Sequence, residues 1–364
     1  MKIAVTGFRG IPGMLGGIET HAEELYPRLA QRGKDIVVIR RKNYARDGLS
    51  EYRGVKLYDI DSPRKKSLET IIHSLKAVWV AKFRLKANIL HIHAVGPGLV
   101  VPFARLLGLK VVFTHHGPDY DRDKWGWFAK MMLRTGERWG VRYADEVIVI
   151  SKVINDLIKE KYGRNDAHTI FNGVQEACKI TDEDYLKSLD ITPRKYFFAM
   201  GRFVPEKNFH QLITAFSAIA EKKGYHLVLA GDADFEDFYA RDLKALARES
   251  GVILPGFIKD RKLFTLLNNA SAFIIPSSHE GLSIALLEAM SYGLPVIASN
   301  ILANKQLNLP EKTYFKLNDE KELTELLTTL VGVDYSPVSY SMEQYDWDYI
   351  TRQTEDVYNK FENK

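Results

Sequence analysis

Short apolar runs recur along the whole chain, and patterns of helical period lie between them. The runs are continuously apolar rather than alternating, which is typical of strands covered on both faces. Regular alternation with helices favours parallel sheets joined by right-handed crossovers. The predicted strands have the sequences KIAVTG, DIVVIRR, VKLYDI, ANILHIHA, KVVFTHH, DEVIVIS and HTIFNGV, and then YFFAMG, YHLVLAG, GVILPGF, SAFIIPS, LPVIAS and KTYFK.

The series of predicted strands is interrupted once, by the less periodic stretch QEACKITDEDYLKSLDITPRK. A chain of 364 residues is also longer than one ordinary hydrophobic core requires. We therefore expect two doubly wound, Rossmann-like α/β domains that face each other across a cleft, residues 1–175 and 176–345. In such sheets ligands bind outside the carboxyl ends of the strands, so the segments after each strand are the first candidates for a site.

The composition limits the class of protein and its partners. Apolar residues make up 46% and charged residues 27% of the chain, as in globular proteins. The net charge of +5 fits an anionic small ligand or surface but is too small to indicate nucleic acid. One cysteine, Cys178, excludes a disulfide framework and a cysteine zinc site. The amino terminus lacks the pattern of a signal peptide, and no apolar run approaches the roughly 20 residues that span a bilayer, so we expect a soluble cytoplasmic protein.

A glycine-rich segment, GFRGIPGMLGG, follows the first predicted strand and leads into a helix. Gly16 and Gly17 lie at the start of that helix, where bare backbone N–H groups can approach a phosphate. The remaining Gly10, Pro12 and Gly13 are equally consistent with a long turn. The spacing matches neither the dinucleotide fingerprint nor the P-loop, which disfavours a Rossmann dehydrogenase.

Two cations follow a strand of the second domain, in the segment GRFVPEKN. Arg202 and Lys207 both lie at the carboxyl end of the strand YFFAM, where they are suited to hold a diphosphate. The alternative is a solvated loop in which Glu206 pairs with Lys207, an arrangement worth about 0–1 kcal/mol at a surface.

Two glutamates mark a later strand–loop–helix segment, SAFIIPSSHEGLSIALLEAM. Glu280 stands in the loop, and Glu288 lies about two helical turns further on among apolar neighbours, where a carboxylate needs a partner. A sugar hydroxyl is one such partner; a helix cap or a core salt bridge is the other explanation. Free N–H groups at the start of the helix form a second anion site, at Gly281, Leu282 and Ser283.

These motifs together resemble one enzyme family. The pattern GRxxxEKN, the pair E-x7-E from Glu280 to Glu288 and the turn SYGLPVIAS resemble family 4 of the glycosyltransferases, which has the GT-B fold. The opening GFRGIPGMLGGIETHAEEL is similar to the rhamnosyltransferase-like branch of that family. The resemblance covers essentially the whole chain. It implies retaining, metal-independent transfer of a sugar from a UDP- or dTDP-linked donor to a hydroxyl of a glycan or lipid-linked oligosaccharide, in cell-surface polysaccharide synthesis and without a cofactor.

The resemblance also implies roles for single residues in donor binding and catalysis. Arg202 and Lys207 would hold the donor diphosphate, Glu288 the ribose, and Glu280 the hydroxyls of the transferred sugar. Backbone groups at 281–283 and the glycines 16 and 17 would contact sugar and phosphate. His93 matches the position of an active-site histidine that orients the sugar, whereas His91 fits a core histidine better.

Other expectations concern the acceptor side and the chain's end. In the segment THHGPDYDRDKWGW, His116, Asp119 and Trp125 would lie on the acceptor side, and carbohydrate stacking by Trp125 or Trp127 competes evenly with packing. The D-x-D at Asp232 and Asp234 is interpreted as a structural loop, not a metal site. A carboxy-terminal helix, about 346–364, would cross back to complete the first domain.

The segment PRKKSLETIIHSLKAVWVAKFRLK, residues 63–86, predicts a basic amphipathic helix. It either packs its apolar side on the first sheet, the favoured interpretation, or lies on an anionic membrane surface, which would make the protein peripheral on the inner face of the cell membrane. Two alternatives to a transferase stay open: an epimerase of GT-B fold, which would convert the donor alone, and a non-catalytic protein that binds nucleotide sugars.

Overall fold

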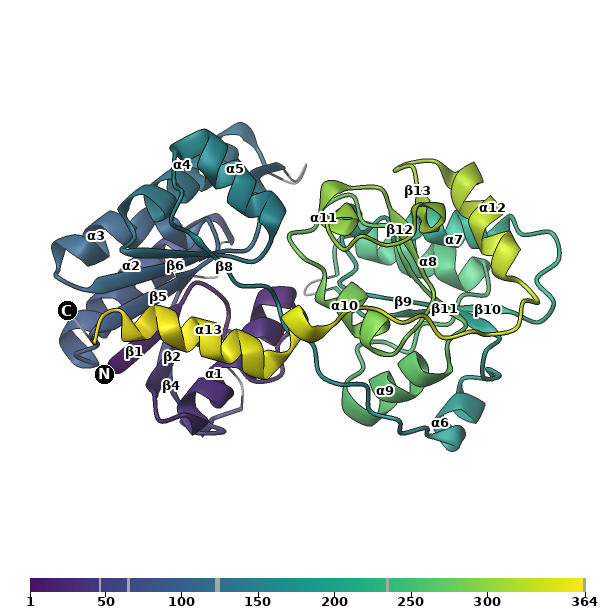
Figure 1. Ribbon diagram of the computed structural model, residues 1–364, viewed down its shortest axis with the longest axis horizontal. Helices are drawn as coiled ribbons and strands as arrows, with labels where there is room; N and C mark the ends of the chain where they lie inside the picture. Colours follow the sequence, from purple (N-terminus) through teal and green to yellow (C-terminus); the bar gives the residue numbers. More distant parts are fainter. Residues whose placement is uncertain (46, 64–65, 122–124, 234–235, 363–364) are drawn as a thin grey trace. The chain divides into compact units, whose positions relative to one another are not determined.

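The computed structural model describes residues 1–45, 47–63, 66–121, 125–233 and 236–362. The chain divides into two compact units (Figure 1). Unit 1 consists of Met1–Gly173 together with Trp347–Lys364, and unit 2 of Val174–Asp346. The sequence-based bounds were 175/176 and 345/346.

Unit 1 is built on an eight-stranded sheet with the order β3-β4-β2-β1-β5-β6-β7-β8. Neighbouring strands are parallel except β3 and β4, which pair antiparallel at one edge. At the centre Ile3 of β1 pairs with Ile36 of β2 on one side and Ile89 of β5 on the other. The strands are β1 Lys2–Thr6, β2 Asp35–Arg41, β3 Glu51–Tyr52, β4 Val55–Ile60, β5 Ile89–His93, β6 Lys110–His115, β7 Glu146–Val149 and β8 His168–Thr169.

Helices cover both faces of this sheet. Right-handed crossovers place α1 on one face and α2 to α5 on the other, and the carboxy-terminal α13 packs beside α1 (Figure 1). A core of Val5, Leu25, Leu29 and Ile350 lies between the sheet and the α1–α13 layer. The helical elements are α1 Gly17–Gln31, α2 Lys66–Trp79 continued by η1 Val80–Arg84, η2 Pro97–Val100, α3 Val101–Leu106, η3 Asp119–Asp121, α4 Trp127–Tyr143, α5 Lys152–Tyr162 and α13 Trp347–Asn359.

Unit 2 contains a five-stranded, fully parallel sheet with the order β10-β9-β11-β12-β13. The strands are β9 Tyr196–Met200, β10 His226–Ala230, β11 Ala272–Ile275, β12 Val296–Ser299 and β13 Tyr314–Phe315. The helical elements are α6 Glu183–Ser188, η4 Pro205–Lys207, α7 Phe209–Ser217, α8 Phe238–Glu249, α9 Asp260–Asn269, α10 Ile284–Ser291, α11 Leu302–Lys305, η5 Glu311–Thr313, α12 Glu320–Leu330 and η6 Glu343–Tyr345.

The two parallel-sheet units confirm the predicted α/β architecture, with two differences in detail. The run GVILPGF forms no named strand; it makes one isolated bridge, between Ile253 and Val228. Pro255 and Gly256 follow directly and limit further pairing. The two-residue strand β3 was not predicted, because an antiparallel edge hairpin this short leaves no apolar run in the sequence.

Candidate functional site

In unit 2 the segments that carry the predicted donor residues meet because their strands are neighbours. Strands β9 and β11 are adjacent and parallel, so their carboxyl ends lie at the same edge of the sheet. The backbone N–H of Ser278 donates to the carbonyl of Glu206 at 2.9 Å, and the Ser278 hydroxyl donates to the same oxygen at 3.2 Å. The loop after β11 is therefore fastened to the loop after β9.

Lys207 and Glu280 form a direct ion pair between these two loops. The Lys207 Nζ lies 2.6 Å from Glu280 Oε1, and the two side chains are 17% and 11% exposed. The ion pair of Lys207 thus joins it to a residue 73 positions away in the chain, not to the adjacent Glu206 as in the solvated-loop alternative. A cation and a carboxylate are held together where the sheet's ligand-binding edge lies.

Glycines bring the backbone of two neighbouring loops into contact beside this pair. Gly231, after β10, has φ +137°, and a Cβ there would lie 1.8 Å from the carbonyl oxygen of Gly201. Gly201 follows β9 and immediately precedes Arg202, whose side chain is partly exposed. Any side chain at Gly231 would displace the loop that carries Arg202.

Helix α10 begins at Ile284, four residues after Glu280. Ser283 is its N-cap and accepts a hydrogen bond from the Leu286 N–H at 3.4 Å. Leu282 and Ser283 are buried, while Gly281 stays partly exposed. Glu288 is partly exposed between buried neighbours. The structure thus brings Lys207 and Glu280 into contact and positions Arg202 and Glu288 on the adjoining loop and helix of the same unit.

Asp232 has an ion-pair partner of its own. Its carboxylate lies 2.8 Å from the Nζ of Lys244 and accepts the backbone N–H of Ala233. Burial raises the pKa of Asp232, but the bonds from Lys244 and Ala233 outweigh it, so the pKa is lowered overall. The second aspartate of the D-x-D, Asp234, lies outside the described residues. In the described ranges, no group of three or more His, Cys, Asp or Glu side chains is arranged to hold a metal ion.

In unit 1 the glycine-rich loop is organised by acids of the helix that follows it. Glu19 of α1 accepts a hydrogen bond from Arg9 Nε at 2.9 Å, and Glu23 accepts one from the Gly13 N–H at 2.8 Å. Gly16 has φ +138°, and a Cβ there would lie 2.2 Å from the Glu19 carboxylate. The local backbone and the Glu19 carboxylate therefore require glycine at position 16. At position 17 a Cβ would meet open space.

A buried cluster of imidazoles and phenols fills the carboxyl end of β5. We call it the histidine–tyrosine cluster; it consists of His21, His91, His93, His116, Tyr26 and Tyr358. The rings of His91 and His93 stack 4.3 Å apart, as expected for alternate residues on one face of a strand. His91 and His93 are 1% and 0% exposed, so both rings are buried; the placement of His93 nearer the cleft than His91 stays a prediction.

Hydrogen bonds connect the cluster from α13 to the loop after β6. Tyr358 bonds to His91 Nδ1 at 2.6 Å, and Tyr26 bonds to both His91 and His93. His93 Nδ1 in turn bonds to His116 Nε2 at 2.8 Å. His116 is partly exposed, and it is the imidazole through which the chain reaches the surface of unit 1. Sequence reasoning missed the two tyrosines, whose only signal was their place on apolar helix faces.

Burial keeps these imidazoles neutral. It lowers the pKa of His91 to about 3 and that of His21 to about 4. The pKa values of His93 and His116 are lowered as well, by burial and by neighbouring histidines. Neutral imidazoles carry one donor and one acceptor each, which is what a chain of hydrogen bonds between rings requires.

The predicted acceptor-side segment lies on the α2–α5 side of unit 1. Asp119 begins η3, and Trp125 is partly buried shortly before α4. Lys124, in the same segment, lies outside the described residues. Trp127 is 78% exposed, so packing does not explain this side chain.

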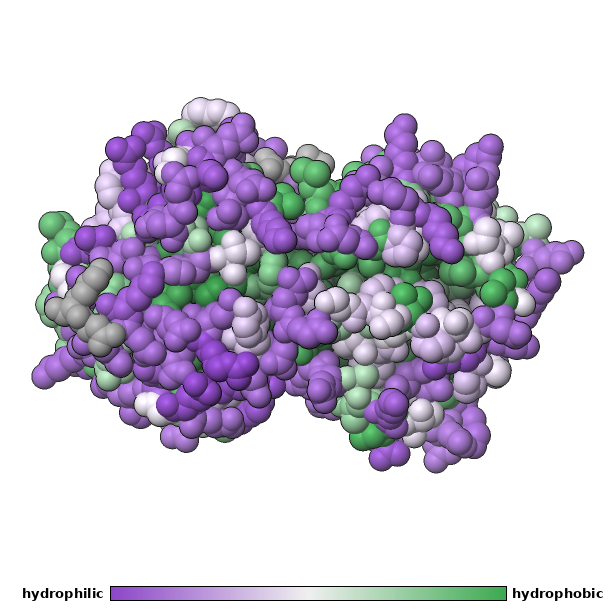
Figure 2. All heavy atoms as spheres, in the orientation of Figure 1, coloured by the Kyte–Doolittle hydropathy of each residue, from purple (hydrophilic) through white to green (hydrophobic). Residues whose placement is uncertain are grey.

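The basic segment 63–86 forms α2 and η1, with residues 64–65 outside the described ranges. Ala77, Val78 and Ala81 are buried, which agrees with packing on the sheet. A second apolar stripe faces outward: Leu75, Trp79 and Phe83 are 44%, 47% and 51% exposed. In Figure 2 hydrophilic residues cover most of the face in view, and apolar residues also surface over α3. Within the described chain, no helix combines the length and the apolar character needed to span a bilayer.

Comparison with solved structures defines the class of fold. The chain is similar to sucrose-phosphate synthase from Thermosynechococcus elongatus, with a TM-score of 0.81, 20% identity and coverage of 99% of this chain and 98% of the other. It is also similar to Anabaena HepE in complex with UDP and glucose, with a TM-score of 0.79, 18% identity and coverage of 99% and 100%. These neighbours are GT-B glycosyltransferases, so the fold is GT-B, as predicted.

Sequence comparison matches the chain to two glycosyltransferase family models. Residues 15–177 match the description "Glycosyltransferase Family 4", and residues 181–333 match "Glycosyl transferases group 1". A relative is glycogen synthase of Mycobacterium tuberculosis, 24% identical over 331 residues that cover 83% of this chain and 78% of the relative. The two matches together span most of the chain and support a glycosyltransferase of family 4. The rhamnosyltransferase-like branch stays a prediction.

Proposed function

We propose that the protein transfers a sugar, with retention of configuration, from a UDP- or dTDP-linked donor to a hydroxyl of a glycan or lipid-linked oligosaccharide. Family membership supports the glycosyl transfer, and the ion pair between Lys207 and Glu280 supports the location of the donor site in unit 2. A nucleotide sugar presents a diphosphate for the cation and sugar hydroxyls for the carboxylate. In the structure these two groups form an ion pair with each other.

The proposed reaction breaks the bond between the anomeric carbon and the diphosphate oxygen. The acceptor oxygen forms the new bond on the same face, and the acceptor proton passes to the departing phosphate. Arg202 and Lys207 stabilise the charge that develops on this leaving group, which is where fixed cations accelerate a reaction most. No metal ion is assigned to this step.

The remaining predicted residues have binding roles in this proposal. Glu288 holds the ribose, Glu280 the hydroxyls of the transferred sugar, and the backbone at 281–283 contributes N–H groups to sugar and phosphate. In unit 1, Gly16 and Gly17 offer backbone N–H groups to the phosphate. His116, Asp119 and Trp125 contact the acceptor, and His93 is a positioning residue that orients His116 through their 2.8 Å bond.

A panel of nucleotide sugars tests the proposal directly. A donor that fits raises the melting temperature of the protein, because ligands that bind only the folded state stabilise it. Turnover should then require an added acceptor. Conversion of the donor alone to its epimer would identify an epimerase instead, and binding without turnover across an acceptor panel would identify a binding protein.

Substitution of the two cations tests the assigned leaving-group role. We expect Arg202→Ala and Lys207→Ala each to reduce turnover by about 10² or more, as for loss of one preorganised anion-stabilising donor. Lys321→Ala is a matched control, since this lysine lies on α12 of the same unit, 87% exposed and paired with Glu325. Turnover near that of the control in both variants at saturating donor would refute the role.

We further propose that the protein associates peripherally with the cytoplasmic face of an anionic membrane through the outward stripe of α2 and η1. Leu75, Trp79 and Phe83 are flanked by Lys82, Arg84 and Lys86, and exposed apolar and basic residues together favour an anionic lipid surface. Sedimentation with anionic vesicles at low salt tests this. Replacing the three cations by glutamine should abolish it, and failure of the wild-type protein to sediment would contradict it.

A further inference from the structure

Helix α4 exposes its largest side chains and buries two of its glycines. Its buried face is made of Gly136, Glu137, Gly140 and Val141. A Cβ at Gly136 would lie 2.1 Å from the carbonyl oxygen of Val95, so the helix approaches the backbone at Val95 too closely for any side chain larger than that of glycine. By contrast the outer face exposes large apolar side chains, with Trp127 78% and Phe128 62% exposed. A surface helix normally has the opposite pattern.

The outer face is also strongly basic. Lys130, Arg134, Arg138 and Arg142 recur every fourth residue, so they form one row along the helix. Like charges at this spacing destabilise a helix, so local helix stability does not explain the row. Among the described side chains, no carboxylate lies within ion-pair distance of these four cations. The row and the exposed aromatic side chains are therefore available to a ligand that is both anionic and apolar.

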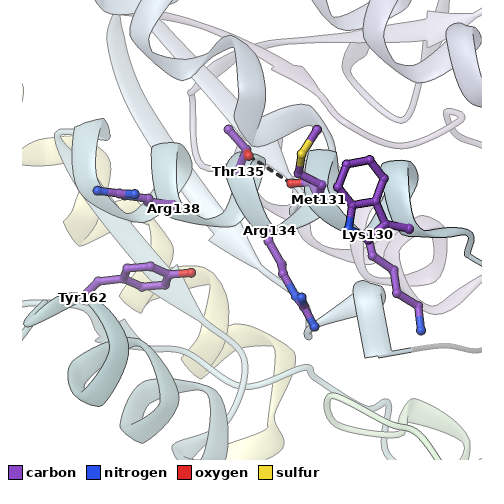
Figure 3. Close-up of a pocket in the computed structure, with 7 residues that line it drawn as sticks. Lys130, Met131, Arg134, Thr135, Arg138 and Tyr162 are labelled. Carbon is purple, nitrogen blue, oxygen red and sulfur yellow. Dashed lines mark hydrogen bonds between the residues drawn. The ribbon is translucent and has the colours of Figure 1, made fainter.

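A hollow of about 370 Å³ lies beside this row, and its lining comes from α4 and α5 (Figure 3). Lys130 and Arg134 extend from α4 to the same side, and the hydroxyl of Tyr162 on α5 points into the space beneath the helix (Figure 3). The lining residues are Trp127, Lys130, Met131, Arg134, Thr135, Arg138 and Tyr162.

The floor of the hollow is fixed by one buried carboxylate. Glu137 is 0% exposed and accepts hydrogen bonds from His115 at 2.8 Å and from Tyr162 at 2.5 Å. Tyr120 donates to the same carboxylate, and Lys161 lies 2.6 Å from the Tyr120 hydroxyl. The lysine that pairs with Glu137 is Lys161, whose Nζ lies 3.8 Å from the carboxylate, rather than a cation of the α4 row. The wall formed by Tyr162 is held in place before any ligand binds.

We propose that this hollow binds the diphosphate group of an amphiphilic ligand whose apolar chain lies on Trp127, Phe128 and Met131. Two arginines and a lysine within about two helical turns suit a group with two or more negative charges, and guanidinium groups bind phosphate oxygens in pairs. The adjacent apolar side chains distinguish this site from one for a free anion. A second copy of the chain is disfavoured as the occupant, because two such basic faces repel each other.

The inference deepens the proposed function, on which its meaning rests, by naming the class of acceptor: a glycan carried on a lipid diphosphate. Such a carrier would bind to unit 1 at a site distinct from the ion pair of unit 2. Binding to this hollow is measurable without a donor and without turnover, so the two proposals can fail separately.

Calorimetric titration of the full chain carrying Lys207→Ala tests the site, since this background removes the lysine assigned to the donor diphosphate in unit 2. The probes are farnesyl diphosphate, inorganic pyrophosphate and farnesol. We expect farnesyl diphosphate to bind about tenfold or more tightly than pyrophosphate, because it also buries apolar surface. Equal affinity for farnesyl diphosphate and pyrophosphate would contradict a contribution of the apolar chain to binding. Equal affinity for farnesol and farnesyl diphosphate would contradict a contribution of the diphosphate.

Three further variants on that background locate the site. The double variant Arg134→Gln with Arg138→Gln should lower the affinity for farnesyl diphosphate by about 100-fold, because two charge-assisted contacts are lost. Trp127→Ser should lower the affinity for farnesyl diphosphate to that for pyrophosphate, and it should leave the affinity for pyrophosphate unchanged. Arg142→Gln is the matched control, because it lies one turn beyond the hollow, and should change affinity less than about threefold. Unchanged binding in the double variant, or an equal loss in the control, would overturn the site; circular dichroism verifies folding of each variant.

Discussion

Acid should unfold unit 1 selectively, because it buries neutral histidines. His21, His73 and His91 are at most 4% exposed, and burial lowers their pKa values to about 4, 4 and 3 from 6.5. A histidine whose pKa is lowered on folding stabilises the fold fully above pH 6.5. As the pH falls below 6.5, the unfolded chain binds protons that the folded unit does not, and this stability is lost.

The size of the effect follows from these values. At about 1.4 kcal/mol per pH unit, each of the three histidines costs about 2 kcal/mol at pH 5, or about 6 kcal/mol together. The lowered pKa values of His93 and His116 act in the same direction. Since a domain is stable by about 5–15 kcal/mol, unit 1 should be close to unfolding at pH 5. In unit 2, His210 is the histidine whose pKa is lowered among the described residues, and it is half-buried.

The assay is urea unfolding followed by tryptophan fluorescence at pH 8 and pH 5. All five tryptophans, at positions 79, 125, 127, 139 and 347, belong to unit 1, so the signal reports that unit alone. His73→Leu should reduce the loss in the free energy of unfolding between pH 8 and pH 5 by about 2 kcal/mol, which is the contribution of one histidine. His279→Gln in unit 2 is the control and should leave the loss unchanged. A loss below about 2 kcal/mol in the wild-type protein would refute the reasoning.

Two further predictions concern stability. Gly231→Ala should destabilise unit 2 by about 3 kcal/mol or more, through backbone strain and a clash with Gly201. Gly224→Ala is the control and should cost only about 1 kcal/mol, because Gly224 has φ +76° but open space around it. Urea unfolding followed by circular dichroism compares the two variants, and equal costs would contradict the close approach of Gly231 to Gly201. Tyr358→Phe removes the 2.6 Å hydrogen bond to His91 and should cost unit 1 about 1 kcal/mol. Tyr349→Phe, on the exposed side of the same helix α13, is its control in tryptophan-detected unfolding, and an equal cost in both would contradict a role for the bond.

The fold was largely predictable because its signal is local. Continuous apolar runs such as those of β1, β2 and β9 identify strands covered on both faces, and the structure places each in a parallel sheet. The errors came where pairing depends on context. The run that contains Ile253 is apolar but ends in Pro255 and Gly256, so it forms a bridge rather than a strand.

The candidate site was predictable as a set of residues but not as a set of contacts. Sequence order placed Lys207 and Glu280 at carboxyl ends of strands, yet the strand order that makes them neighbours arises only when the sheet assembles. Burial was the least predictable property. The sequence did not predict that the His93 ring is fully buried against Tyr26 of α1 and His91 of β5. The large exposed side chains of α4 follow from the glycines on its inner face.

The central claim is that Lys207 and Glu280 form a donor site and not only a stabilising pair. A charge-swap variant, Lys207→Glu with Glu280→Lys, separates these roles, because it retains an ion pair between the loops and reverses which loop carries the cation. Titration of the best donor from the panel into the wild-type, Lys207→Ala and swapped proteins is the most direct measurement. We predict near wild-type stability for the swapped protein and donor affinity reduced at least tenfold, as in Lys207→Ala, for one lost contact to a charged group. Wild-type donor affinity in the swapped protein would contradict the account.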